Sequence, residues 1–458
     1  MKTNLFIVRM IAATMFLAGT PALFAQTSEV GQLKTAVTSL DQTVQELKQK
    51  IADLEKQQAV ISAELPPGPL SPVFYRQAFA DHQMAAPRPG DLTLDPKYRG
   101  FIPIPHTTAL IKFNAKPRVD FIFDTGNPGN PDDFVTAQIP VDGDPDKGGG
   151  SRFNLSAKGS RLMLDVIAPT LEGAPRFYYE NDFFGSGNSA LNFNIRHLYG
   201  EYYNIILGQT FSAFEDPDAW PDTLDYEGPN SAISLRQPLL RYQIPLTTQW
   251  QINASVEKPS SEVDTSGDPT ASSVNHAPDI GVNTRWEEAS FGHVQLSGIA
   301  RVIGADGQTN GDQTVFGGGL SLSVVKSLFK RDSLQLLGTL GEGIARYGND
   351  NVFNNDAAYD AAGGLKALPY MAVMAGYTHG WTEKLRSTAS YGFVNIDNEA
   401  AQGPDAYHQT HYASLNIMWQ PFRLLTVGLE GLYGRKKVQS GATGADWRIQ
   451  MGVVYSLF

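Results

Sequence analysis

Residues 447–458 read WRIQMGVVYSLF, and this stretch decides the fold class. Successive side chains of an extended strand point to opposite sides of its sheet. One side of this strand therefore carries the apolar residues Trp447, Ile449, Met451, Val453, Tyr455 and Leu457. The other side carries polar or small residues, among them Arg448, Gln450 and Gly452. Such a strand predicts a sheet with one apolar face and one polar face.

The same alternation begins the strand-rich part of the sequence. From about Thr108 the apolar residues are Ile111, Phe113, Ala115, Val119, Phe121 and Phe123, and the polar residues between them are Lys112, Asn114, Lys116, Arg118 and Asp120. A lipid-facing barrel with a wet lumen requires this pattern of apolar outside and polar inside. A soluble β-sandwich also alternates. The number of strands therefore has to separate the two folds.

The pattern recurs often enough to favour the barrel. Candidate strands cover residues 108–124, 151–167, 174–183, 189–198, 201–209, 233–243, 248–257, 279–287, 291–303, 314–325, 334–347, 370–380, 384–396, 409–419, 424–434 and 446–457. These make about sixteen strands, an even number in the range that leaves a water-filled channel. The sequence predicts an all-β fold, a transmembrane antiparallel β-barrel over residues 108–458. Its final Phe458 resembles the C-terminal signature of outer-membrane barrels.

The predicted connections alternate between long and short, as outer loops and periplasmic turns of such barrels do. The long ones cover residues 125–150, 210–232, 258–278, 348–369, 397–408 and 435–445, and the shortest is Gly200 alone. An even number of strands places both ends of the barrel domain on the periplasmic side.

Composition excludes several other classes of protein. The sequence holds no run of 18 or more apolar residues, which removes transmembrane helices from consideration. The 458 residues include no cysteine and carry a formal net charge of -11 at pH 7. The missing cysteines exclude disulfides and thiol catalysis. The negative charge argues against nucleic acid as a partner, because its phosphates would be repelled.

The N-terminal region has its own pattern. Residues 1–25 resemble a signal peptide, with Lys2 and Arg9 before the short apolar run 10–18. Residues 26–64 carry an aliphatic seam at heptad spacing, formed by Leu33, Val37, Leu40, Val44, Leu47, Ile51 and Leu54. This spacing predicts a coiled coil, here in the periplasm, although a single amphipathic helix lying on another surface is the alternative. Residues 65–107 are proline-rich and are interpreted as a linker.

The connection 210–232 is predicted to fold into the lumen as a constriction loop. It carries the acidic residues Glu215, Asp216 and Asp218 together with aromatic residues such as Trp220 and Tyr226. Aromatic side chains favour burial of the loop over exposure to solvent. A solvated acidic surface loop is the alternative.

Arginines at inward positions predict a positive pore wall. The residues assigned to it are Arg118, Arg161, Arg196, Arg236, Arg241 and Arg346. Walls of arginine and lysine select anions. The alternative is that these arginines pair with lumen carboxylates and only stabilise the barrel. No metal site, cofactor or catalytic grouping is predicted, because the histidines are scattered and residues 142–146 match a calcium loop only weakly.

Several segments resemble one family, the DcaP-like trimeric outer-membrane porins. They are Arg196-His197-Leu198-Tyr199-Gly200-Glu201, Leu207-Gly208-Gln209-Thr210-Phe211-Ser212, Arg236-Gln237-Pro238-Leu239-Leu240-Arg241-Tyr242 and Gly341-Glu342-Gly343-Ile344-Ala345-Arg346-Tyr347. The resemblance implies a sixteen-stranded trimer that passes small anionic solutes such as dicarboxylates. The sequence departs from the expected pattern at Phe211, where tryptophan is expected, and at Ala345, where glycine is expected.

The expected function is therefore that of a diffusion porin and not of an enzyme. The expected partners are two further copies of the chain, outer-membrane lipid and lipopolysaccharide, and small anionic solutes. A different class of function is also open, in which a plugged barrel tethers the outer membrane to peptidoglycan or a periplasmic partner through the coiled coil. Conductance of the purified protein separates the two.

Overall fold

The computed structural model describes residues 100–457, except 170–172, 187–189, 330 and 351–353, and seven residues between 38 and 50. The chain divides into two units, residues 1–68 and 69–458. In the first unit the described residues are Thr38, Gln42, Gln45, Glu46, Lys48, Gln49 and Lys50, all helical and exposed. The signal peptide, the heptad seam, the linker up to residue 99 and Phe458 lie outside the described residues. None of the described helices is long and apolar enough to cross a membrane.

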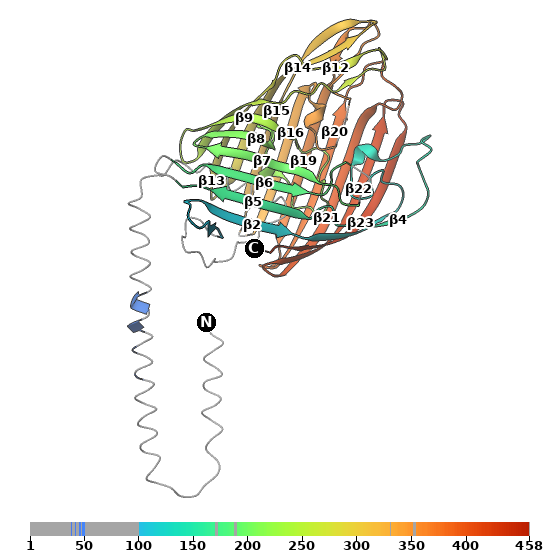
Figure 1. The fold of residues 1–458 in the computed structure, drawn as a ribbon. Coiled ribbons are helices and arrows are strands. Elements are labelled where there is room, and N and C mark those ends of the chain that lie inside the picture. Colours follow the sequence, from blue (N-terminus) through green and yellow to red (C-terminus); the bar gives the residue numbers. More distant parts are fainter. Residues whose placement is uncertain are drawn as a thin grey trace, which may run out of the picture. The chain divides into compact units, whose positions relative to one another are not determined.

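The second unit is built on one large antiparallel sheet, which has twenty strands among the described residues. Its strands are β1 (Ile102–Pro103), β2 (Leu110–Lys116), β3 (Arg118–Asp124), β4 (Arg152–Ser156), β5 (Arg161–Ile167), β6 (Arg176–Asp182), β7 (Asn194–Tyr202), β8 (Ile205–Phe211), β9 (Arg236–Pro245), β10 (Trp250–Glu257), β12 (Ser272–Val274), β13 (Asp279–Glu288), β14 (Gly292–Gly307), β15 (Gly311–Leu328), β16 (Asp332–Glu342), β19 (Pro369–Gly380), β20 (Leu385–Ile396), β21 (Tyr407–Phe422), β22 (Leu425–Val438) and β23 (Thr443–Tyr455). Figure 1 shows these strands running side by side.

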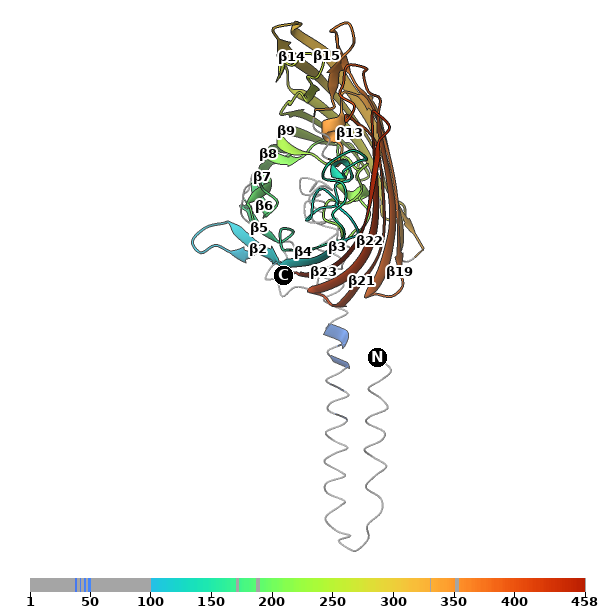
Figure 2. The same cartoon turned by 90° about the vertical axis from the view of Figure 1, so that its right-hand side faces the viewer.

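The sheet closes on itself. The last strand β23 pairs antiparallel with β3, with Met451 opposite Phe121 and Gly452 opposite Asp120. From β5 onward the long strands that follow one another in the chain also pair with one another, so that no long strand keeps a free edge. Closure satisfies the backbone donors and acceptors that an open edge would expose to lipid. Figure 2 looks into the resulting ring.

Burial alternates along most of the long strands, as the sequence predicts. In β3 the apolar Val119, Phe121 and Phe123 are exposed on the outside, whereas Arg118 and Asp120 between them are buried. The same holds in β23 for exposed Trp447 and Ile449. Apolar side chains therefore cover the outer wall and charged side chains fill the inner wall, which is the arrangement of a membrane-embedded barrel.

Three details of the sequence-based boundaries are wrong. Gly200 is not a turn, because it lies inside β7, and the turn falls at residues 203 and 204, where Tyr203 adopts a φ of 51°. The connection predicted over 435–445 is short, since β22 extends to Val438 and β23 begins at Thr443. The strand predicted over 334–347 ends at Glu342, and Arg346 lies in a short 3-10 helix, η4 (Ala345–Tyr347). In the first two cases strand pairing extends beyond the local pattern, and in the third it ends at Glu342, before the pattern does.

Loops at one rim of the barrel are folded segments. Strands β11 (Val263–Asp264), β17 (Ala357–Tyr359) and β18 (Leu365–Ala367) form a second, three-stranded sheet. It packs on Ile303 and Ala305 of β14 through a buried apolar cluster. A larger apolar cluster lies inside the barrel and joins Phe214, Ile344 and Tyr347 to Ile299 and Tyr370 of the wall. Apolar packing thus holds these folded loops against the barrel wall.

Candidate functional site

The loop between β8 and β9, residues 212–235, lies inside the barrel, as Figure 2 shows. Its apolar residues Phe214, Ala219 and Leu224 are at most 2% exposed. Burial of these side chains in a lumen lined with polar groups requires that the loop itself packs there, since water would otherwise reach them. The structure thus places the loop inside the barrel, and its role as a constriction stays a prediction.

The first half of the loop is held by one side of the wall. Asp216 and Asp218 both accept hydrogen bonds from Arg285 of β13, over 3.2 and 2.7 Å. His293 of β14 also contacts Asp216, with 2.8 Å between Nε2 and Oδ2. These charge-assisted contacts are stronger than neutral ones, so the start of the loop is firmly anchored.

These anchoring groups also have the ligand types of a metal site. The ligand atoms of Asp216, Asp218 and His293 lie within 4.8 Å of one another. Arg285, however, forms ion pairs with both carboxylates. Its guanidinium group therefore already supplies the positive charge that a metal ion would bring. We therefore interpret this group as an ion-pair cluster that fixes the loop.

The second half of the loop contacts other strands. Arg118 of β3 donates a hydrogen bond to the carbonyl oxygen of Leu224, and Tyr412 of β21 donates one to Asp225 over 3.2 Å. The backbone N–H of Asp225 donates to Glu430 of β22. Contacts with strands on several sides of the ring hold the loop across the lumen.

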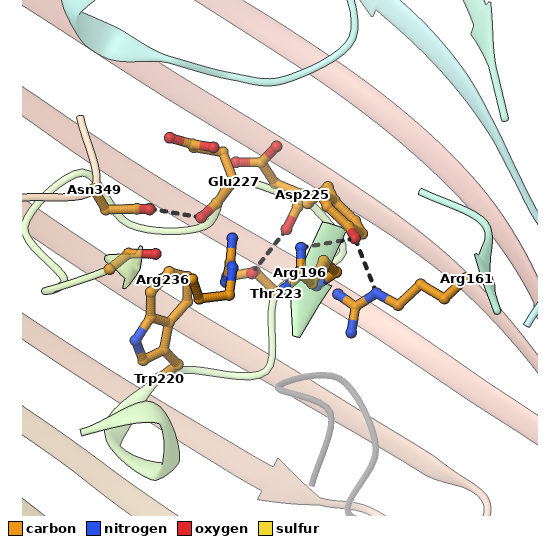
Figure 3. A pocket seen from close by; sticks show the side chains of 10 residues that line it. Arg161, Arg196, Trp220, Thr223, Asp225, Glu227, Arg236 and Asn349 are labelled. Atoms are coloured by element: carbon orange, nitrogen blue, oxygen red, sulfur yellow. Dashed lines mark hydrogen bonds between the residues drawn. The ribbon is translucent and has the colours of Figure 1, made fainter. Parts of the chain in front are cut away.

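Three arginines converge on a pocket beside this second half. The pocket is lined by Arg161, Arg196, Trp220, Thr223, Asp225, Tyr226, Glu227, Ser234, Arg236 and Asn349. Figure 3 shows the guanidinium groups of Arg161, Arg196 and Arg236 on one side, while the carboxylates of Asp225 and Glu227 point away from them. Arg161 binds Glu180 at 3.2 Å, and Arg196 binds Glu180 at 3.2 Å and Asp182 at 2.8 Å. The pocket is narrow and its cationic groups face the space.

Arg236 differs from its two neighbours. Its guanidinium lies 5.6 Å from the ring centroid of Phe211, and it forms no salt bridge with any carboxylate in the described part of the chain. Strand alternation alone does not place it in the lumen, since Pro238 and Leu240, two and four residues later, are exposed on the outer face. Arg236 reaches the lumen because it is the first residue of β9, where the chain leaves the inward loop.

The other predicted pore arginines are inward or buried but bound to partners. Arg118 pairs with Asp120 at 2.6 Å, and Arg346 pairs with Asp279 at 3.0 Å. Arg241 is 3% exposed and donates to the carbonyl oxygen of Phe211. The structure therefore brings Arg118, Arg161 and Arg196 together around Tyr226, and Arg236 lines the same pocket. Arg241 and Arg346 do not line that pocket.

The predicted acidic residues do not face these arginines as a group. Asp216 and Asp218 bind Arg285 on another part of the wall. Glu215 is 1% exposed and accepts a hydrogen bond from the backbone N–H of Leu235 over 2.9 Å. Glu215 lies in the loop, outside the strands that cross the membrane, and its burial raises its pKa to about 8, although nearby Arg236 acts in the opposite direction. At neutral pH this carboxyl group is mostly protonated.

Two residues matter here that the sequence interpretation left without a role. Tyr226 was noted only as an aromatic residue of the loop, yet its hydroxyl contacts three charged side chains. Arg285 belongs to the same inward alternation as its neighbours in β13. This alternation is the sequence signal that predicts an inward Arg285. Its pairing with Asp216 cannot be predicted in the same way, because it depends on the path of the loop.

A closed antiparallel barrel with an apolar outer wall, a charged lumen and a loop folded across that lumen defines an outer-membrane channel. Residues 97–457 match the family model described as DcaP outer membrane protein. The chain belongs to the DcaP outer membrane protein family, whose members are non-enzymatic channels.

Solved structures share this fold. The outer membrane channel DcaP of Acinetobacter baumannii is 22% identical, with a TM-score of 0.68, and the match covers 76% of this chain and 97% of that one. An anion-selective porin from Comamonas acidovorans is 12% identical, with a TM-score of 0.51, over 76% of this chain and 100% of that one. No curated protein matches the sequence significantly. At these identities the structures establish the fold alone.

Proposed function

We propose that this porin is a passive channel for small hydrophilic anions, dicarboxylates among them. The observation that carries the proposal is the pocket at the inward loop. Of its three cations, Arg161 and Arg196 stand against the carboxylates of Glu180 and Asp182, while neighbouring Arg118 pairs with Asp120. Arg236 is the third cation of the pocket and has no salt bridge in the described part of the chain. Asp225 and Glu227 also line the pocket, but burial raises the pKa of both carboxyl groups, which lie in the inward loop, and favours their neutral forms. The guanidinium groups therefore dominate the charge of the pocket, and a net positive charge in a narrow passage attracts anions and repels cations.

Arginine suits such a passage for two reasons. Its guanidinium stays charged at any physiological pH, and its planar donors match the oxygens of a carboxylate. A solute also has to leave, which favours several partial contacts over one tight site. The pocket fits this requirement, because Arg161 and Arg196 already share their donors with Glu180 and Asp182.

The decisive experiment is the reversal potential of the purified protein in planar bilayers under a salt gradient. We expect anion selectivity in the wild-type channel. Replacing both Arg161 and Arg236 with glutamine should shift the potential toward cation selectivity and slow succinate entry into vesicles. Arg435→Gln is the matched control, since Arg435 is exposed. A cation-selective wild-type channel would contradict the proposal.

We also propose the following organisation. The long strands cross the membrane in sixteen passes, with β2 and β3 forming one pass and β4 and β5 another. Three copies of the barrel associate, and a periplasmic coiled coil from residues 26–64 joins them. Deletion of residues 26–64 should leave a barrel that still forms pores. Loss of the heat-modifiable gel mobility of the barrel in that truncation would contradict two separate modules.

The orientation can be tested with cysteines, because the natural chain has none. Gly403 lies in the long connection between β20 and β21, and a side chain there meets no other atom within 4 Å. A cysteine at Gly403 should react with a membrane-impermeant reagent on intact cells. A cysteine at Pro421, at the opposite rim, should react only after the outer membrane is opened. The reverse result would invert the proposed topology.

The tethering function proposed as the alternative requires a blocked barrel. Purified protein that gives no conductance steps, while it still migrates as a folded barrel, would favour the tether over the channel.

A further inference from the structure

Tyr226 occupies a singular position among the pore arginines. Its hydroxyl oxygen accepts hydrogen bonds from Nε of Arg161 over 2.9 Å and from Nη1 of Arg196 over 3.0 Å. The same hydroxyl donates to Oδ2 of Asp182 over 2.8 Å. One O–H donor and two acceptor lone pairs are thus fully used. A neutral oxygen lies at the point where two guanidinium groups meet.

The ring of Tyr226 is held by the same cations. The guanidinium carbons of Arg118, Arg161 and Arg196 lie 5.4, 4.9 and 5.3 Å from the ring centroid. Phe184 stacks on the ring, with centroids 4.6 Å apart and an angle of 20° between the planes. Cations near a ring face are attracted to it. These contacts fix the orientation of the ring and therefore the position of its hydroxyl group.

Donors from two arginines that point at one oxygen form the arrangement that also binds a carboxylate or phosphate oxygen. We propose that the Tyr226 hydroxyl fills an anion subsite formed by Arg161 and Arg196, and so limits how tightly a passing carboxylate is held. This inference rests on the proposed anion channel. It names the residue that sets the balance between capture and release at the constriction.

A phenolic hydroxyl is neutral and satisfies the two guanidinium donors only in part, so a carboxylate can compete for them. Arg236 lines the same pocket and has no salt bridge in the described part of the chain, so an arriving anion meets it as well. Without the hydroxyl, the donors of Arg161 and Arg196 would be offered to the solute, and the solute would leave more slowly.

The test uses the full-length protein in planar bilayers, with succinate as the probe and its block of the chloride current as the readout. We expect Tyr226→Phe to lower the succinate dissociation constant roughly threefold to tenfold, the effect of one additional ordinary hydrogen bond. Tyr226→Glu places a carboxylate in the subsite and should weaken succinate block and reduce anion selectivity. A purely structural role predicts changes in the same direction for both variants.

The matched control is Tyr179→Phe, which removes a hydroxyl bound to Asn181 over 2.9 Å on the outward alternation of β6. It should leave succinate block unchanged. Unchanged block in Tyr226→Phe, in a wild-type channel that is anion-selective, overturns the inference and leaves the proposed function standing. Failure of Tyr226→Phe to assemble also overturns it, because the hydroxyl would then serve folding. A wild-type channel without anion selectivity refutes the proposed function itself.

Discussion

The lumen holds two groups of arginines that look alike in the sequence and differ in their surroundings. In the pocket group, Arg161 and Arg196 share Glu180 and Asp182, and Arg236 has no salt bridge in the described part of the chain. In the second group, which we call the packed group, Arg301 and Arg346 lie between Asp279 and Asp356. Arg301 binds Asp356 at 2.7 Å and Asp279 at 3.4 Å, and Arg346 binds Asp279 at 3.0 Å.

The difference lies in the balance of charge. Two carboxylates neutralise the two guanidinium groups of the packed group, and both carboxylates are fully buried. Arg301 also donates to the carbonyl oxygens of Gly343 and Ser260, so it joins two loops to the wall. The packed group is therefore neutralised within the wall, and by our proposal the pocket group supplies the electric field that selects anions. An inward arginine is not by itself a pore residue.

Within the packed group, substitution of Arg301 should destabilise the barrel most. Arg301→Gln should leave Asp279 and Asp356 buried with less compensation, and removal of one partner from a buried ion pair costs about 3–5 kcal/mol. The temperature at which the barrel loses its compact mobility on unheated gels should fall clearly below that of Arg435→Gln. An unchanged transition temperature would mean that these groups are hydrated and contribute little.

The inward loop provides the next effect. Arg285→Gln removes the partner of Asp216 and Asp218, a loss of about 1.5–3 kcal/mol per charged hydrogen bond at most. We expect the loop to remain attached through Arg118 and Glu430 but to fluctuate, which single-channel recordings would register as increased open-channel noise. A recording as quiet as that of the wild type would show that the ion-pair cluster is dispensable for the loop.

A direct comparison of the two groups needs one variant from each. Arg236→Gln should lower the anion-to-cation permeability ratio several-fold. The interaction energy between one charge near the passage and a passing ion is about 1 kcal/mol. Arg346→Gln should change the ratio much less, because Asp279 already neutralises Arg346. Reversal potentials of the two variants in the same salt gradient check this. Equal shifts would remove the distinction between the groups.

The smallest effect concerns Glu215 and pH. Its pKa is raised to about 8 by burial, so the group is neutral at pH 6 and ionises as the pH passes 8. The new negative charge near Arg236 should reduce anion selectivity between pH 6 and pH 9. In Glu215→Gln this part of the pH dependence should vanish. A wild-type selectivity that stays constant over this range would contradict a titrating Glu215.

The family and the fold follow from features that are local in the sequence. Alternation in residues 108–124 and 446–457 identifies the outer wall, and it also places Arg118 inward without knowledge of any partner. Turns were less predictable, as Gly200 illustrates. A glycine inside a paired strand and a glycine in a turn have the same local signature, and only pairing with β8 and β6 tells them apart.

The sequence by itself determined which face of each strand meets lipid, because side-chain direction in a strand depends only on the parity of the position. Only the tertiary structure decided which charges meet. Arg236 shares its parity with outward residues and still lines the pocket. Tyr226 finds Arg161 and Arg196, which are 65 and 30 residues away in the chain. Charge pairing depends on distances across the lumen, and those arise from ring closure and the path of the inward loop, which no local pattern encodes.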